Sequence, residues 1–171
     1  MQFSTKHHCG PDQAVYLYSA EDYAWFSSEM GRELGAGTFG ENLTLSDFGG
    51  NTLYIGDRLK IGEVVLELTA PRIPCATLAA RMGEPGFVKR FKQAERPGVY
   101  ARVLTQGMLR QGDEVVYTRG DSDVTVMELF HDYYDTTRTP AGLERLLSAP
   151  VAVRSRQDLE ARLEKALAGP V

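Results

Sequence analysis

The sequence predicts a mainly β fold, either a barrel or a two-layer β structure, followed by a short helical module. In the first two thirds of the chain, short runs of β-forming residues are separated by glycine turns, which is typical of such folds. After Gly120 the spacing of the apolar residues becomes helical. We therefore expect a β domain over residues 1–120 and a small module of three helices over residues 121–171.

The β domain is expected to combine short strands with short helices. Val64, Leu66 and Leu68 alternate with their neighbours as in a strand with one buried face, and Ser19 begins a helix as its cap. The expected strands are residues 14–18, 42–45, 56–62, 64–69, 99–104 and 114–118, and the expected helices are 19–30, 75–82, 86–94, 124–133, 141–147 and 157–167. The strands 99–104 and 114–118 are expected to pair with each other through turns at Gly107 and Gly112.

The composition argues against several classes of function. The 171 residues carry a net charge of -4, which disfavours a nucleic-acid surface. No apolar run approaches the roughly 20 residues that a membrane span needs, and the N-terminal residues lack a signal-peptide pattern. We expect a cytoplasmic protein whose two cysteines, Cys9 and Cys75, are reduced thiols.

A rigid segment delivers a cysteine to the start of a helix. Residues 70–75 read Ala-Pro-Arg-Ile-Pro-Cys, and prolines restrict the backbone ahead of the helix. A thiol there lies near the positive end of the helix dipole, which favours the thiolate, and Arg72 adds to this effect. Thiolates are soft ligands for copper, zinc, iron–sulfur clusters or molybdenum. On local sequence alone, Cys75 is equally well explained as a small buried apolar residue.

Two further segments carry polar groups beside glycine turns. Residues 37–43, Gly-Thr-Phe-Gly-Glu-Asn-Leu, allow a turn whose amides face an anion, with Thr38 and Asn42 as hydrogen-bonding groups, although alone they favour a plain helix-to-strand connection. Residues 6–12 place histidines, including His8, where they could bind a phosphate, an oxo group or a metal, or simply be solvated. Asp57 adjoins a glycine, as do Asp113 and Asp121, and is interpreted as a turn residue.

The order of these motifs resembles the MOSC family, named after the C-terminal domain of molybdenum cofactor sulfurases, and within it the stand-alone bacterial proteins of the YiiM type. Four segments carry the resemblance, at residues 8–12, 39–43, 55–57 and 71–75. It covers about residues 6–117, and the C-terminal helices resemble the small three-helix module of YiiM-type proteins. Cys9 stands where the family usually has a glycine.

The resemblance implies a MOSC-type β-barrel with flanking helices and a small C-terminal helical module. Family members usually have further β structure ahead of the histidine turn, so this chain is expected to be a shortened version, to have a misassigned start, or to close its barrel differently. An incomplete barrel leaves unpaired backbone groups at a strand edge, which favours association. A homodimer is therefore expected.

The resemblance also implies molybdenum cofactor, a pterin-coordinated molybdenum, at the barrel mouth. The Cys75 thiolate would be the metal ligand and the catalytic residue, and Arg72 would hold the cofactor's phosphate or another anionic group. Pyridoxal phosphate binding is a further description at the level of the family. The remaining contacts to the cofactor would come from Asn42, Thr38, His8 and Gly40.

The activity that the resemblance implies is detoxifying reduction of N-hydroxylated compounds, such as N-hydroxylated bases, by N–O cleavage at molybdenum. Nothing in the chain resembles a flavin or iron–sulfur site, so an external electron donor protein is implied. The alternative is a non-catalytic carrier of molybdenum cofactor, or of sulfur as a Cys75 persulfide. A third interpretation is a shortened barrel without cofactor that serves interaction through its helices. Turnover with supplied electrons discriminates the reductase from the carrier.

Overall fold

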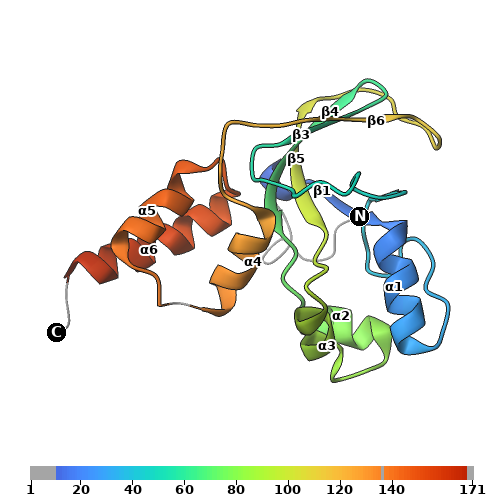
Figure 1. The fold of residues 1–171 in the computed structure, drawn as a ribbon, viewed down its shortest axis with the longest axis horizontal. Coiled ribbons are helices and arrows are strands. Elements are labelled where there is room, and N and C mark those ends of the chain that lie inside the picture. Colours follow the sequence, from blue (N-terminus) through green and yellow to red (C-terminus); the bar gives the residue numbers. More distant parts are fainter. Residues whose placement is uncertain (1–10, 136, 169–171) are drawn as a thin grey trace.

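The computed structural model describes residues 11–135 and 137–168. Within these ranges the strands form one curled sheet in the order β2-β1-β5-β4-β3-β6, a half-barrel with β2 and β6 at its edges (Figure 1). Strands β1 and β2 run parallel, and the other neighbours are antiparallel. The strand bounds are Val15–Ser19 for β1, Leu43–Leu45 for β2, Arg58–Ile61 for β3, Val64–Pro71 for β4, Val99–Thr105 for β5 and Val115–Thr118 for β6. The homodimer expected from an open edge stays a prediction.

The helices lie in two groups, one below the sheet and one to its left in the view of Figure 1. The first group is α1 (Ala20–Met30), α2 (Ala76–Met82) and α3 (Phe87–Ala94), and the second is α4 (Val126–Tyr134), α5 (Pro140–Ser148) and α6 (Val153–Ala168). A short 3-10 helix, η1 (Pro11–Gln13), precedes β1. In residues 11–135 and 137–168, every helix is too short or too polar to cross a bilayer.

Local side-chain caps explain where the helices begin. The Ser19 Oγ accepts a hydrogen bond from the Asp22 amide at 3.0 Å, which confirms the expected start of α1. Thr125 caps α4 in the same way. Helix α6 begins at Val153, ahead of the expected residue 157, because its first amide donates to the Asp12 carboxylate at 3.2 Å. This extra turn brings the start of α6 next to the sheet.

Aromatic side chains form the core between β1 and the helices α1, α2 and α3. Phe39 is fully buried, and its ring centroid lies within 5.6 Å of those of Tyr18, Tyr23, Phe26, Phe87 and Phe91. Aromatic pairs such as these, three of them edge-to-face and two tilted, contribute about 0.5–1.5 kcal/mol each beyond the area they bury. Since Phe39 lies in the connection between α1 and β2, this core holds the backbone of residues 37–42 in place.

The C-terminal helices share a hydrophobic core with the sheet. Leu129 of α4, Leu146 of α5 and Leu159 of α6 are buried in one cluster with Leu66 and Leu68 of β4. Full burial of such a side chain is worth about 1.5–3 kcal/mol. The helices are therefore packed onto the sheet, and the division at residue 120 stays a prediction from the sequence.

The expected pairing of residues 99–104 with 114–118 is wrong. Strand β5 pairs with β1 and β4, whereas β6 pairs with β3 at the far edge. The connection passes around the β3–β4 turn, where the Glu63 amide donates to Met108 O at 3.1 Å and the Met108 amide donates to the Glu63 carboxylate at 2.9 Å. This detour lets β6 cover the open side of β3, which a hairpin with β5 would leave unpaired.

Gly98→Ala is expected to destabilise the protein by about 2–3 kcal/mol, because strain at positive φ adds to a clash with backbone. Gly98 has a φ of +63°, and a Cβ there would lie 2.5 Å from Leu17 O. Urea unfolding gives the free energy change. Gly112→Ala is the matched control, since Gly112 also has a positive φ, +91°, but no atom within 4 Å of its Cβ position. Equal losses in the two variants would contradict a role for the close approach.

Candidate functional site

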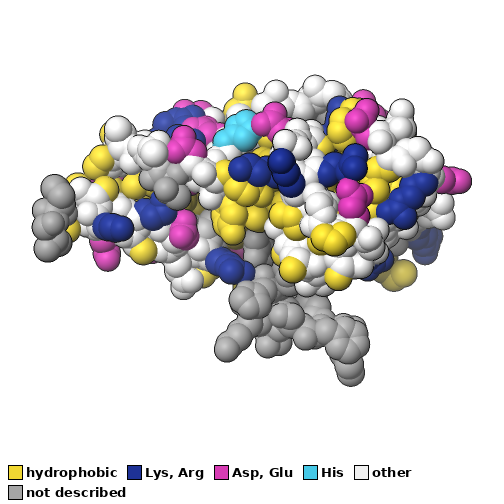
Figure 2. Space-filling model, turned by 90° about the horizontal axis from the view of Figure 1, so that it is seen from below, with side chains coloured by type: hydrophobic (Ala, Val, Ile, Leu, Met, Phe, Trp, Pro, Cys, Tyr) yellow, Lys and Arg dark blue, Asp and Glu magenta, His cyan; other side chains and the backbone are white. Residues whose placement is uncertain are grey.

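A cavity of about 910 Å³ lies between the sheet and the C-terminal helices. Its volume is in the upper part of the range for small-molecule sites, about 300–1,000 Å³. Seen from below, the molecule presents hydrophobic side chains beside lysine and arginine side chains near its middle (Figure 2). One wall comprises Tyr16, Phe39, Gly40, Asn42, Ala70, Pro71, Arg72, Ile73, Pro74, Cys75, Ala76, Thr77, Arg81 and Tyr100, and the other comprises Leu129, Asp132, Tyr133, Arg154, Ser155, Asp158 and Leu159, with Gln13 and Ala14 also contributing.

Cys75 lies on the first wall, where the chain leaves β4 and enters α2. It is the N-cap residue of α2, with extended backbone at φ -134° and ψ 172°, so the helix begins one residue later than expected. Its carbonyl accepts hydrogen bonds from Leu78 N and Ala79 N, while its side chain makes no capping hydrogen bond. The thiol is free and partly exposed, and it is therefore available to a ligand in the cavity.

Two arginines bring positive charge to this wall. The Arg72 guanidinium lies over the Tyr16 ring, 4.7 Å from its centroid, and donates to the carbonyl of Phe39. Arg81, in the last turn of α2, donates to Gly37 O at 2.7 Å. Both arginines are thus oriented by the loop of residues 37–42, and both side chains keep further N–H donors for an anion.

The loop of residues 37–42 is held by its own polar network. Gly40 lines the cavity at a φ of +83°, and a Cβ there would lie 3.7 Å from an Arg81 nitrogen. Asn42 also lines it, but its side-chain oxygen already accepts from Tyr16 N at 2.7 Å. Thr38 does not line the cavity, since its hydroxyl donates to Gly35 O at 2.6 Å.

Glu41 holds the same loop in place through hydrogen bonds to its carboxylate. Its carboxylate accepts hydrogen bonds from Gly37 N, from the Thr44 hydroxyl at 2.8 Å and from the Tyr23 hydroxyl at 2.7 Å. The turn that carries Gly40 is therefore fixed on both sides, as a binding loop requires. The cofactor contact expected from His8 falls outside the described residues, as does Cys9.

Two tyrosines form the floor beside Cys75. The rings of Tyr16 and Tyr100 lie 5.0 Å apart, and the Tyr16 hydroxyl donates to Pro97 O at 2.8 Å. Burial raises the pKa of Tyr100, the Arg72 charge opposes this, and Cys75 adds to it. The Tyr100 phenol therefore keeps its proton at neutral pH and can donate a hydrogen bond into the cavity.

The second wall is rigid because a buried acid joins its helices. Asp132 of α4 is almost fully buried, and its carboxylate pairs with Arg162 of α6 at 2.6 Å and with Arg138, which lies ahead of α5. The Asp132 hydrogen bond raises the pKa of Arg162, so this cation stays charged. Tyr133 and Asp158 are exposed at the cavity beside this network.

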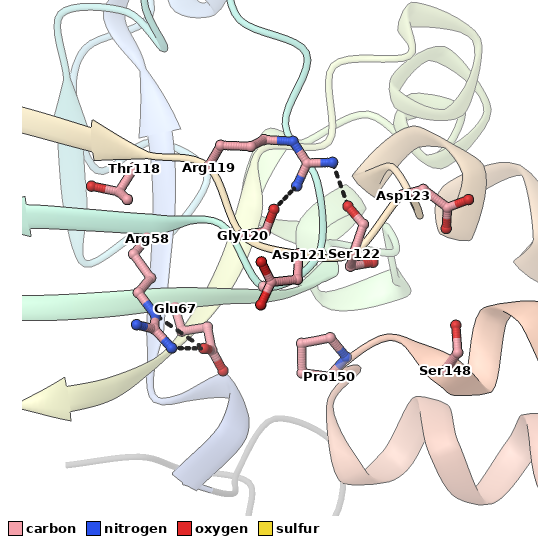
Figure 3. Close-up of a pocket in the computed structure, with 11 residues that line it drawn as sticks. Arg58, Glu67, Thr118, Arg119, Gly120, Asp121, Ser122, Asp123, Ser148 and Pro150 are labelled. Carbon is pink, nitrogen blue, oxygen red and sulfur yellow. Dashed lines mark hydrogen bonds and ion pairs between the residues drawn. The ribbon is translucent and has the colours of Figure 1, made fainter.

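A smaller hollow of about 450 Å³ lies at the junction of β3, β4 and β6 with α5 (Figure 3). Its cations are used internally: Arg58 pairs with Glu67 at 3.4 Å, and Arg119 pairs with the buried Asp57 at 3.0 Å. Arg119 also donates to the carbonyls of Gly120 and Ser122. No metal-ligand cluster of three or more His, Cys, Asp or Glu occurs among the described residues. The arginines of this hollow pair with carboxylates and hold parts of the fold together. The larger cavity is therefore the candidate site.

Comparison with known sequences assigns the family. Residues 4–116 match the sequence profile of the MOSC domain. The chain belongs to the MOSC family. This MOSC chain is 33% identical over 142 residues to protein YflK of Bacillus subtilis (strain 168), and 34% identical over 112 residues to a protein named "Reductase" of Gibberella moniliformis (strain M3125 / FGSC 7600).

A solved structure shows the same MOSC fold. YiiM from Geobacillus stearothermophilus superposes with a TM-score of 0.83 at 29% identity, covering 90% of this chain and 80% of that one. The expected MOSC-type fold with flanking helices is confirmed, and so is the resemblance to the bacterial YiiM type. The two curated matches cover 82% and 63% of this MOSC chain. The chain spans 64% of the length of YflK and 20% of that of the Gibberella protein.

The structure brings together most of the site residues expected from the sequence. Cys75, Arg72, Gly40 and Asn42 all line one cavity, although their roles toward a cofactor stay predictions. Sequence reasoning missed the second wall entirely, because Tyr133 and Asp158 reach the cavity only through the packing of α4 and α6. The one sequence signal for them was a helical pattern with polar and aromatic residues on it, which specifies no partner. The other residues missed are Arg81, Tyr16 and Tyr100.

Proposed function

We propose that this MOSC protein binds molybdenum cofactor in the larger cavity and uses it to reduce N-hydroxylated compounds. The observation that carries the proposal is the free Cys75 thiol, which makes no capping hydrogen bond, in a cavity that two arginines also line. Family membership supports cofactor binding, and the name of the Gibberella relative supports a reductase.

The donor set fits such a cofactor. A cysteine thiolate is a soft ligand of the kind molybdenum accepts. Arg72 and Arg81 would hold the cofactor's phosphate, and Gly40, which has no side chain, leaves room for close approach to the loop. Asn42 would hydrogen-bond through its amide group, and His8 is proposed as a weaker contact. The contact expected from Thr38 is not proposed, since its hydroxyl donates to Gly35 O and does not line the cavity. Pyridoxal phosphate fits less well, since no lysine occurs among the described residues that line the cavity.

The chemistry divides between cofactor and protein. When bound, the cofactor supplies two-electron reduction, for which the balance is R–NHOH + 2 e⁻ + 2 H⁺ → R–NH₂ + H₂O. Cys75 would hold the metal, and the arginines would orient the anionic end of the cofactor. The Tyr100 hydroxyl, whose pKa burial raises further above neutrality, would donate a hydrogen bond to the substrate oxygen. An external electron donor protein would supply the electrons, and we propose the cytosol as the compartment.

The partly exposed thiol of Cys75 would equally suit a carrier of the cofactor, or of sulfur as a persulfide. Turnover distinguishes the two functions. Protein isolated from a host that makes molybdenum cofactor is given reduced methyl viologen and 6-hydroxylaminopurine. We expect viologen oxidation with formation of adenine, at least about tenfold faster than with metal-free protein. Stoichiometric molybdenum without any adenine formation would contradict the reductase and favour the carrier.

A further inference from the structure

The second wall of the cavity presents an aromatic ring and a carboxylate. Tyr133 of α4 keeps 58% of its surface exposed, and it lines the cavity together with Asp158 of α6. The Tyr134 ring meets that of Tyr133 edge-on, with centroids 5.1 Å apart at 84°. Tyr134 is itself held by the Lys92 ammonium, 3.9 Å from its ring centroid. The Tyr133 ring therefore packs against Tyr134 on one side, and its exposed part lines the cavity.

The second wall carries the carboxylates that line the cavity. Arg72 and Arg81 lie on the wall with Cys75, whereas the carboxylates of Asp132 and Asp158 lie on the other, together with the Arg154 guanidinium. Asp132 is committed to two arginines, as described above. Among the described residues, the Asp158 carboxylate makes a long contact of 3.4 Å to Arg162, and its side chain is 68% exposed. An exposed pair of this kind is weak, so the carboxylate can accept a hydrogen bond from a ligand.

We propose that α4 and α6 form the substrate-recognition wall, in which Tyr133 stacks on a planar ring and Asp158 accepts hydrogen bonds from its N–H groups. This inference rests on the proposed function and names the residues that would recognise the base of its substrate. Stacking needs an exposed aromatic face, and every heteroaromatic base offers its own face to it. The Asp132 pairs keep α4 and α6 at a constant spacing, so that the ring and the carboxylate act together.

Kinetics with two substrates tests the wall. For 6-hydroxylaminopurine, Tyr133→Ala is expected to raise KM about tenfold and leave kcat within about twofold, whereas Tyr133→Phe keeps the wild-type KM. For N-methylhydroxylamine, which cannot stack, both variants should match wild type. Because Tyr133 is exposed, its replacement leaves folding intact. An equal rise of KM for both substrates, or no rise for the purine, would overturn the proposal.

The carboxylate is tested with a matched pair on one helix. Asp158→Asn is expected to raise KM for the purine about fivefold. Glu160→Gln makes the same charge change at an exposed residue of α6 that does not line the cavity, and it should have no effect. A purine KM that responds equally to the two variants would point to net charge alone and would exclude Asp158 from recognition.

Binding of adenine separates this inference from the proposed function, since adenine has no N–O bond to reduce. Calorimetric titration should show adenine binding to wild type and to Tyr133→Phe, and binding weakened about tenfold in Tyr133→Ala. This pattern supports the recognition wall even in a protein that shows no reductase turnover. Wild-type protein that reduces 6-hydroxylaminopurine but binds adenine equally well in the Tyr133→Ala form would refute the wall and leave the reductase standing.

Discussion

Cys75→Ser is expected to reduce bound molybdenum from about one per chain to less than about a tenth of that, because a hydroxyl is a far poorer ligand than a thiolate for a soft metal site. The substitution only replaces the sulfur with an oxygen, in a side chain that makes no capping hydrogen bond to α2. The fold should therefore persist. Metal analysis of protein purified from a host that makes molybdenum cofactor gives the stoichiometry, and circular dichroism verifies the fold.

Cys9→Ser is the matched control, since Cys9 is the other cysteine of the chain. We expect it to retain the wild-type molybdenum content. Loss of metal in the Cys9 variant with retention in the Cys75 variant would reverse the assignment of the ligand. Absence of metal from folded wild-type protein would refute cofactor binding by this chain.

Asp57→Ala is expected to lower the free energy of unfolding by about 3–5 kcal/mol, the largest loss that we predict for a single residue. The Asp57 carboxylate is fully buried and accepts hydrogen bonds from Tyr54 N at 2.8 Å, Gly120 N at 2.9 Å and the Tyr117 hydroxyl at 2.6 Å. It also pairs with Arg119 at 3.0 Å. Without it, partly buried donors from β6 and the following loop would lose their acceptor. Urea unfolding measures the change.

Asp121→Ala provides the control for this loss. Asp121 is an exposed acid beside a glycine, close in sequence to the same loop. Its replacement is expected to change the free energy of unfolding by less than about 0.5 kcal/mol. A loss in the Asp57 variant as small as this would show that water replaces the carboxylate, and that the network does not hold β6 to the sheet.

The difference between these two aspartates shows what sequence patterns can and cannot supply. Asp57 was interpreted as a turn residue, and it does accept from Tyr54 three positions earlier. Its contacts to Tyr117 and Gly120 depend on β6 lying beside β3, and that pairing was not predictable from local turn signals. Alternation of apolar residues predicted the strand β4, but the expected single buried face is wrong, since both faces of β4 are buried over most of its length. The choice of neighbouring strand is a property of the whole sheet.

The candidate site divides in the same way. Cys75 and Arg72 could be predicted because the proline-flanked segment is local in sequence and ordered motifs surround it. Tyr133 and Asp158 could not, since they meet the cavity only after α4 and α6 pack onto the sheet through Leu129 and Leu159. A short motif predicts which side chain would contact a cofactor. The residues of the second wall depend on tertiary packing, which a local motif does not specify.

The shared core of the sheet and the C-terminal helices has a mechanical consequence. A helical cap that opens and closes needs a seam with few buried contacts, and here the seam is filled by leucine side chains. We therefore expect the cavity to keep its width when a ligand binds. Its size would then set an upper limit on the molecules that it admits.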